Sequence, residues 1–442
     1  LDIASKAGEF AIAICKRCER MGISTDAIQD AVLSIPTSSV AYEFTRKMYK
    51  ILGLDIKTIA SNFRSYDLLN LKDDDINYQN INLVLSQKKD FCDISLTDDV
   101  KKEGGFMKFN AVVGNPPYQE SDGGAQASAR PIYPFFVNLS RDLKPDCACI
   151  IMPARWYTGG KGGKDMDAFR VSMLDDIHIK ELHDFLHPEV IFPDTNNRGG
   201  ICYFLWDRQY DNSKSKTKVV THKGNSEIEM VTRFIRTEGL EVFIRSSEAI
   251  NIIHKVIVSG ATDVMSDHIS PRKPFGIESN IIHKPEWHDS ESGLCEPLKC
   301  VGKGKKFGFV ESSLIHSHRE LIDVWKVFTP RANNVGTELN DDNLNTLIGE
   351  PKTICTEAYI VIGGDLHLDK NRAKNLANYF KTKFVRFMHG LAKASHDATS
   401  KTYRFVPTQD FSEEWTDEKL YQKYGLTQEE INYIENSIKP MD

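Results

Sequence analysis

The chain has 442 residues, of which 40% are hydrophobic and 27% are charged, and its formal net charge is −6. These values are typical of a globular protein with two or three domains. They exclude a uniformly basic nucleic-acid-binding chain, although a local basic surface remains compatible with them. Nine cysteines without a disulfide-framework spacing favour reduced thiols and a cytoplasmic location. No metal site is predicted, and no apolar run approaches the roughly 20 residues of a membrane span.

The first half of the chain alternates between strand and helix patterns. Residues 1–22 read as a strand end, a glycine turn and a helix, and residues 38–53 read as a helix that Ser38 and Gly53 cap. Further helices are predicted at 131–143 and 169–176, and further strands at 31–36, 56–63, 109–115, 147–153, 177–185 and 200–206. This alternation predicts an α/β fold with a doubly wound, Rossmann-like parallel sheet over residues 1–208.

The pattern changes in the second half. Residues 209–245 are predicted to form a linker or hairpin, and residues 246–442 an α+β domain that ends in helices. At the start of the sequence, the first predicted strand already ends at Asp2, whereas a buried strand usually has about five residues. We therefore expect at least one strand upstream of Leu1.

Two loops stand where an open parallel sheet binds its ligands, outside the carboxyl ends of the strands. One is the turn at residues 2–10, where Gly8 lets the backbone approach a ligand before a helix begins. The other is Asn-Pro-Pro-Tyr at residues 115–118, directly after an apolar strand. Consecutive prolines end the strand and make this second loop stiff.

The Asn-Pro-Pro-Tyr loop suits a planar amine on an aromatic ring. The nitrogen lone pair of such an amine is delocalised, so the amine is a poor nucleophile. The Asn115 side-chain oxygen and the Pro116 carbonyl are two acceptors that could bind its two hydrogens, and the prolines hold both acceptors in place. The ring of Tyr118 offers a flat surface for stacking.

These features resemble a known family. Gly-Asn-Pro-Pro-Tyr after an apolar strand, with an earlier D-x-x-x-x-x-G-x-F turn, is similar to N(6)-adenine DNA methyltransferases. The nearer resemblance is to the methylase part of large type II (IIG-like) restriction–modification enzymes. The segments that carry it are ARPIYPFFVNLSRDLKP, IIMPARWYTGGKG and FPDTNNRGGICYFLWDR, all within residues 1–210. The order of the motifs resembles the gamma arrangement of the family.

The resemblance implies S-adenosyl-L-methionine as methyl donor, double-stranded DNA as partner, and a target adenine flipped out of the duplex. It implies a methyltransferase domain at 1–208 and a DNA target-recognition domain at 246–442. The implied cofactor-binding residues are Asp2, Ala4, Gly8, Phe10 and Asp67. The implied catalytic residues are Asn115, Pro116, Pro117 and Tyr118. The chain departs from the family where Lys6 replaces a glycine, and where no acidic residue follows the second strand.

Basic residues gather in two parts of the second half, at 299–306 and 370–405, where aromatic residues lie between them. Such runs suit phosphate contacts, although a solvated helix face is the simpler interpretation. The loop at 329–336 adds side chains that can read base edges. The DNA-binding candidates are Lys303, Lys305, Lys306, Arg331, Asn333, Asn334, Lys381, Lys383 and Arg386.

Other functions stay open. The chain could be a sequence-recognition module for an endonuclease fused or associated upstream, with weak or no methylation. It could also methylate the exocyclic amine of cytosine, or act on RNA or protein. Five-position cytosine methylation is disfavoured because it needs a cysteine nucleophile, and no Pro-Cys dipeptide occurs.

Overall fold

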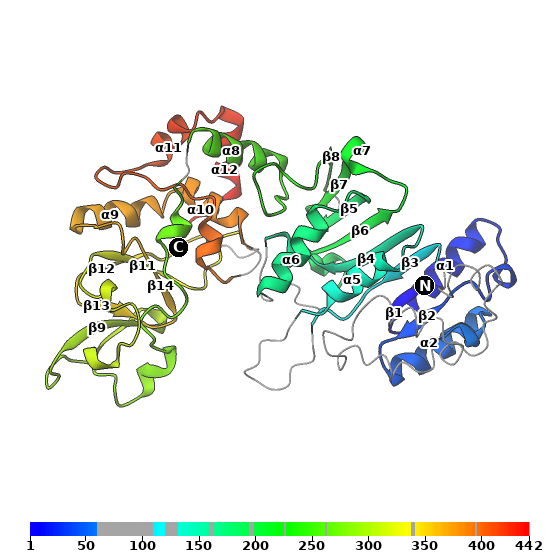
Figure 1. Cartoon of the computed structure of the whole chain (residues 1–442), viewed down its shortest axis with the longest axis horizontal. Coiled ribbons are helices and arrows are strands. Elements are labelled where there is room, and N and C mark those ends of the chain that lie inside the picture. Colours follow the sequence, from blue (N-terminus) through cyan, green and yellow to red (C-terminus); the bar gives the residue numbers. More distant parts are fainter. Residues whose placement is uncertain are drawn as a thin grey trace. The chain divides into compact units, whose positions relative to one another are not determined.

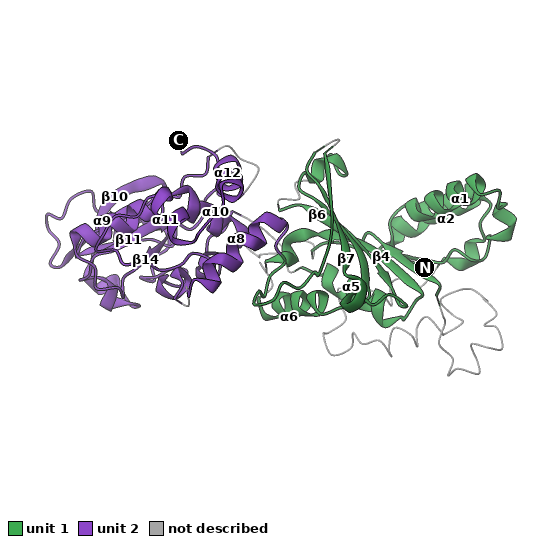
Figure 2. Cartoon of the chain, turned by 90° about the horizontal axis from the view of Figure 1, so that it is seen from above, with its two compact units in different colours: residues 1–243 green, residues 244–442 purple. Residues whose placement is uncertain are grey.

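The chain forms two compact units, Leu1–Phe243 and Ile244–Asp442, which Figure 2 shows in green and purple. In the described part of the chain, no helix has the length and apolar character to cross a membrane. This computed structural model describes residues 1–59, 109–119, 131–158, 163–193, 199–224, 227–260, 263–336, 341–393 and 396–441.

Unit 1 is built on an eight-stranded sheet with the strand order β2-β1-β3-β4-β6-β5-β7-β8 (Figure 1). The strands are β1 (Asp2–Ser5), β2 (Ser34–Pro36), β3 (Ala111–Gly114), β4 (Cys147–Pro153), β5 (Ile179–Phe185), β6 (Ile201–Asp207), β7 (Thr217–His222) and β8 (Ile228–Arg233). The four strands β2, β1, β3 and β4 are parallel neighbours. The prediction of an α/β fold with a large, mostly parallel sheet is therefore confirmed.

Two strands depart from the predicted parallel arrangement. Strand β6 lies between β4 and β5 and is antiparallel to both, and β8 is antiparallel to β7. No described α-helix lies between β5 and β6 or between β7 and β8, where only a short 3-10 helix, Pro188–Val190, precedes β6. A parallel neighbour needs a long crossover, whereas a direct return connection gives an antiparallel pair. Apolar character alone does not distinguish the two directions, so the sequence did not reveal this reversal.

The predicted caps of unit 1 are present. The Ser38 side chain accepts a hydrogen bond from the N–H of Ala41 at the start of α2, and Gly53 ends this helix in the left-handed conformation. The helices are α1 (Glu9–Arg20), α2 (Ser39–Leu52), α5 (Tyr133–Asp142), α6 (Gly163–Leu174) and α7 (Asn212–Ser215).

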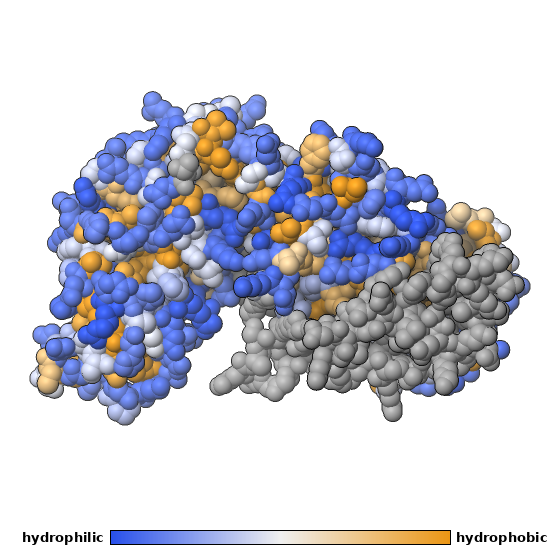
Figure 3. Space-filling view, viewed as in Figure 1, coloured by the Kyte–Doolittle hydropathy of each residue, from blue (hydrophilic) through white to orange (hydrophobic). Residues whose placement is uncertain are grey.

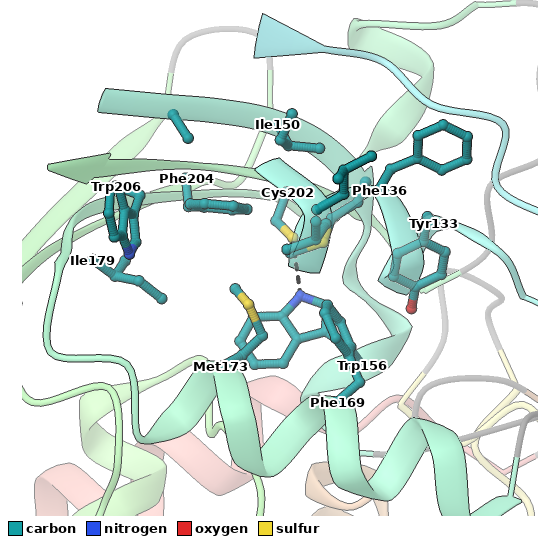
Figure 4. Packing of buried hydrophobic residues seen from close by; sticks show 14 of the residues in the cluster. Tyr133, Phe136, Ile150, Trp156, Phe169, Met173, Ile179, Cys202, Phe204 and Trp206 are labelled. Atoms are coloured by element: carbon teal, nitrogen blue, oxygen red, sulfur yellow. Dashed lines mark hydrogen bonds between the residues drawn. The ribbon is translucent and has the colours of Figure 1, made fainter. Parts of the chain in front are cut away.

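The main core of unit 1 lies between the sheet and helices α5 and α6. Figure 4 shows Trp156 at its centre, with its indole N–H directed at the sulfur of Cys202, 3.3 Å away. The ring of Trp156 packs edge-on against Phe169 of α6. A second cluster fixes α1 and α2, and includes Ala11 and Tyr49. The sheet edge that carries the two candidate loops is thus supported by packed helices.

The compact units divide at Phe243, whereas the sequence placed the edge of the first domain near residue 208. The difference arises because β7 pairs with β5 along its length and β8 pairs with β7. The antiparallel strands at 217–233, within the segment 209–245 for which the sequence predicts a linker or hairpin, therefore extend the sheet of unit 1.

Unit 2 contains two small sheets and a set of helices. One sheet has the order β10-β9-β13 and the other β12-β11-β14. The predicted capping box of the last helix is present, because Thr427 and Glu430 each accept the backbone N–H of the other. The strands are β9 (Pro297–Gly302), β10 (Lys306–Glu311), β11 (Lys326–Pro330), β12 (Leu347–Gly349), β13 (Thr353–Cys355) and β14 (Tyr359–Ile362). The helices are α8 (Ser247–Val258), α9 (Lys370–Tyr379), α10 (Lys383–Leu391), α11 (Asp417–Lys423) and α12 (Gln428–Ser437).

We predict that Gly114→Ala destabilises unit 1. A Cβ at Gly114 would stand 2.7 Å from Cγ2 of Ile3 and 3.3 Å from Cδ1 of Ile150. Overpacking of this kind costs about 1–3 kcal/mol, which urea denaturation followed by circular dichroism would measure as a lower free energy of unfolding. Gly224→Ala is the control, because nothing lies within 4 Å of its Cβ position. Equal stability of the two variants would contradict the prediction.

Candidate functional site

The two candidate loops leave the same edge of the sheet. Strands β1 and β3 are parallel neighbours, with Asp2 opposite Val113, and the N–H of Val113 donates to the carbonyl of Leu1 at 2.8 Å. Their carboxyl ends therefore point the same way. The turn after β1 and the Asn-Pro-Pro-Tyr loop after β3 are thus side by side, as the sequence predicted for a ligand site.

The Asn-Pro-Pro-Tyr loop holds polar atoms away from solvent without satisfying them. Oδ1 of Asn115 and the hydroxyl of Tyr118 are buried, and neither has a hydrogen-bond partner among the described residues. Burial raises the pKa of the Tyr118 phenol above its usual range. Pro116 is buried and Pro117 half-buried. A buried acceptor without a donor costs free energy, so such atoms are typical of sites that a ligand completes.

Tyr118 is attached to the core of unit 1. Its ring packs against the main hydrophobic cluster, and its carbonyl accepts the N–H of Ile132 at 3.2 Å. Gln119 bridges Pro131 on the same side. The loop is thus fixed at its far end as well as at the end of β3, which limits reorganisation when a ligand binds.

Strand β1, which leads into the other candidate turn, contains a second buried acceptor. Asp2 is 2% exposed, and its Oδ1 accepts the N–H of Ala4 at 3.4 Å, while Oδ2 has no partner in the described part of the chain. Burial raises the pKa of Asp2 to about 6. Gly8 has a φ of 80°, which glycine adopts without strain, and it precedes the first residue of α1. Phe10 is half-buried within that helix.

Helix α2 supports this turn, a role that the sequence analysis missed. The hydroxyls of Ser5 and Thr45 lie 3.1 Å apart, and a Cβ on Gly8 would stand 3.3 Å from Cβ of Met48. Ala41, Thr45 and Tyr49 form the buried stripe of α2 at helical spacing. That spacing was the available signal for Thr45. A side chain at Gly8 would press on α2 as well as strain the backbone.

The departures from the family pattern have clear structural counterparts. Lys6 is exposed, so it is not buried in the turn where the family has glycine. After β2, the Ser38 side chain caps α2 through the N–H of Ala41, 3.1 Å away. The predicted cofactor contact Asp67 lies outside the described residues.

The DNA-binding candidates of unit 2 separate into exposed and buried groups. Asn333 is 6% exposed, and its Oδ1 accepts from Nζ of Lys393 at 2.5 Å. Arg386 is 3% exposed and donates to the carbonyl of Lys439 at 2.9 Å. Because these two side chains are enclosed within the unit, the expectation that they contact DNA is corrected, and we leave both out of any DNA surface.

The remaining candidates differ in how they are paired. Arg331 forms an ion pair with Asp397 at 3.1 Å, and Lys383 forms one with Glu435. Asn334 is half-buried. Exposed side chains are found at Lys303, Lys305, Lys306 and Lys381.

The aromatic residues among the basic residues of 370–405 are core residues. Figure 3 shows hydrophilic residues over most of the described surface on the face it draws. In this segment the rings are turned inward and are at most 4% exposed, namely Tyr379, Phe380, Phe384, Phe387 and Tyr403. They are therefore not available to stack on bases. The burial of these rings agrees with the simpler interpretation, in which two amphipathic helices bury their aromatic residues and leave a basic face in solvent.

No group of His, Cys, Asp and Glu that could hold a metal ion is found among the described residues. Every cysteine in the ranges that the structure covers is free of a disulfide.

Comparison with known proteins links the Asn-Pro-Pro-Tyr loop to a methylase family. Residues 24–192 match the family model "Eco57I restriction-modification methylase", a span that includes 115–118 and leaves out the turn at 2–10. The chain is 31% identical over 157 residues to an "uncharacterized adenine-specific methylase" of Mycoplasma pneumoniae (strain ATCC 29342 / M129 / Subtype 1). This match covers 34% of the present chain and 37% of that protein, so the chain spans little more than a third of the length of this curated relative.

Solved structures similar to the chain include two restriction–modification enzymes. The type IIL enzyme MmeI in complex with DNA has a TM-score of 0.48 and 8% identity, over 100% of this chain and 71% of that chain. The type IIG restriction endonuclease BpuSI has a TM-score of 0.36 and 11% identity, over 98% of this chain and 57% of that chain. The resemblance found in the sequence is confirmed by the family and sequence matches: residues 24–192 match the model of an Eco57I restriction–modification methylase, and part of the chain is similar to an adenine-specific methylase.

Proposed function

We propose that the chain transfers a methyl group from S-adenosyl-L-methionine to the N(6) amine of a flipped adenine in duplex DNA, as part of a restriction–modification system. The observation that carries this proposal is the pair of buried acceptors without partners in the described chain, Asp2 Oδ2 in β1 and Asn115 Oδ1 in the loop that follows the adjacent strand β3. The match of residues 24–192 to a restriction–modification methylase supports the same reaction.

The roles of the Asn-Pro-Pro-Tyr residues follow from their chemistry. Asn115 Oδ1 accepts one hydrogen of the target amine, and the carbonyl of Pro116 accepts the other. With both hydrogens bound, the nitrogen lone pair is less delocalised into the ring and more nucleophilic. The two prolines keep these acceptors fixed, and Tyr118 stacks on the base. When bound, S-adenosyl-L-methionine supplies an electrophilic methyl group on a sulfonium sulfur.

The turn at 2–10 fits the cofactor. Oδ2 of Asp2 is buried and could accept a hydrogen bond from a ligand. Gly8 has no side chain, so a ligand could approach the backbone at the start of α1. Asp2, Ala4, Gly8 and Phe10 would hold the cofactor beside the start of that helix, where free N–H groups favour a negatively charged group. Asp67 remains a sequence-based proposal.

A second function has one observation in its favour. The exposed Lys6 in place of the family glycine would suit a chain that reads DNA for a nuclease with little methylation of its own. Measuring DNA binding and methyl transfer on the same preparation separates the two functions, because the recognition module binds DNA without transfer.

We predict that Asn115→Ala lowers the rate of methyl transfer about a hundredfold or more, because one preorganised acceptor is lost. The measurement is single-turnover transfer of a labelled methyl group to duplex DNA. Affinity for DNA is expected to stay within about twofold of wild type, since truncation removes one contact of many.

Asn110→Ala is the matched control for this experiment. Asn110 precedes the same strand at its other end, where its Nδ2 donates to Asp146 at 2.8 Å on the surface. We expect its transfer rate to equal that of the wild-type chain. Retained transfer in Asn115→Ala would refute the role of Asn115.

We also predict that affinity for S-adenosyl-L-methionine falls below pH 6. The pKa of Asp2 is raised to about 6 by burial, so its carboxylate becomes protonated and loses acceptor capacity as the pH falls through that value. Binding should weaken about tenfold between pH 8 and pH 5, by titration calorimetry. Asp2→Asn should remove most of this pH dependence, and an unchanged profile in that variant would assign the effect to another group.

A further inference from the structure

The hairpin β9–β10 carries free positive charge around an exposed ring. Its loop and the two flanking strands place Lys299, Lys303, Lys305 and Lys306 at the surface, and none of these four forms an ion pair with a described residue. Phe307 follows directly and is 50% exposed. We call Lys303, Lys305 and Lys306 the tip lysines.

Several other cations of unit 2 are paired or buried. Lys352 pairs with Asp323 at 2.8 Å, and Arg272 pairs with Glu357 at 3.1 Å. Lys326 is fully buried and donates to backbone carbonyls. The tip lysines therefore differ from these cations in retaining both exposure and charge that no carboxylate of the described chain offsets.

Packing keeps the hairpin tip rigid. The indole of Trp287 lies so close to Gly308 that a Cβ there would be 2.3 Å from Cε2 of the indole. A Cβ on Gly302 would likewise stand 3.2 Å from the same ring. At the loop itself, the N–H of Lys305 donates to the hydroxyl of Tyr359 at 3.2 Å. Two glycines and one tryptophan thus fix the base of the tip, and Tyr359 fixes its end.

The geometry within the hairpin places the ring beside a cation. Phe307 is opposite Val301 in the antiparallel pair, and Nζ of Lys299 lies 5.3 Å from the centre of the Phe307 ring. The carboxylates nearest in sequence are at the other end of the hairpin, where Glu311 accepts the N–H groups of Cys295 and Glu296. The tip is therefore positive and apolar together.

We propose that this tip is a DNA-contacting element in which the tip lysines bind phosphates and Phe307 makes the apolar contact with the bases. This inference rests on the proposed function only in that DNA is the substrate. Charge complementarity supports it, because duplex DNA presents closely spaced phosphates to any element that enters a groove. Two-stranded hairpins fit the major groove, and inserted Phe side chains are a recurrent means of separating base steps.

The lysine test replaces all three tip residues with glutamine and measures affinity for a labelled duplex over a range of salt concentrations. Each phosphate contact contributes about 0.9 to the slope of log affinity against log salt, so the slope should fall by about 2–3. At low salt, affinity should fall roughly tenfold or more. Because the three side chains are exposed, their replacement should leave the fold intact, and circular dichroism of the variant checks this.

The matched control removes three exposed cations of α9 in the same unit, Lys370, Arg372 and Lys374, also to glutamine. Its net charge equals that of the lysine variant. We expect its salt slope to match that of the wild-type chain. An equal loss of slope in both variants would overturn the proposal, because it would show that overall charge acts in place of the tip.

Phe307→Ala tests the apolar contact. We expect affinity about tenfold weaker at an unchanged salt slope, since no charge is removed. Phe307→Trp keeps a ring and should bind within about threefold of the wild-type chain. Val258→Ala is the control, because Val258 is 85% exposed in the same unit. Wild-type affinity in Phe307→Ala would remove the ring from the proposal.

Two further measurements separate this inference from the proposed function. If the wild-type chain transfers methyl groups while the lysine variant binds DNA normally, the tip proposal fails and the enzyme assignment stands. If the wild-type chain binds DNA through the tip but transfers no methyl group, the enzyme assignment fails alone. Vesicles of phosphatidylserine and phosphatidylcholine test the alternative partner: tip-dependent binding to vesicles with tip-independent binding to DNA would overturn the proposal.

Discussion

The contact between Ile3 and Gly114 determines how the two candidate loops are placed. It joins the strands β1 and β3, and any side chain at Gly114 would overlap the Ile3 methyl group. Because these strands are parallel and adjacent, the residues that follow them emerge together. The glycine before Asn-Pro-Pro-Tyr thus has a packing role, which is to let this candidate loop begin close to the turn after β1.

Buried polar atoms without partners in the described chain lie at this part of the sheet. Asp2 and Asn115 each bury an oxygen that nothing in the described chain binds, whereas nearby hydroxyls are paired, such as Ser34 with Tyr49 at 2.7 Å. Burying an acceptor without a donor lowers stability. Ligand donors at these positions would recover that free energy, so the same atoms that weaken the free protein would favour binding.

Local sequence signals predicted the elements but not all of their arrangement. Ser38, Ser246 and Thr427 cap their helices as their residue types indicate, because capping depends on a few neighbouring atoms. The candidate catalytic loop was identifiable for a similar reason, since two prolines after an apolar strand are a local pattern. Strand direction depends on the connections between strands, so the antiparallel direction of β6 could not be predicted from its own residues.

Burial explains why basic residues were the least predictable part of the site. Asn333, Arg386 and Lys393 have the same residue types as DNA-contacting side chains, yet Lys393 donates to Asn333 and Arg386 donates to the carbonyl of Lys439 inside the unit. Their partners come from segments far away in the sequence, so no local sequence pattern reveals that these side chains are buried. The tip lysines have no such partners among the described residues. Glu311 of the same hairpin lies at its opposite end, where it accepts backbone N–H groups. Unit 2 therefore divides its cations between those that hold the fold together and those that remain available to an anionic partner.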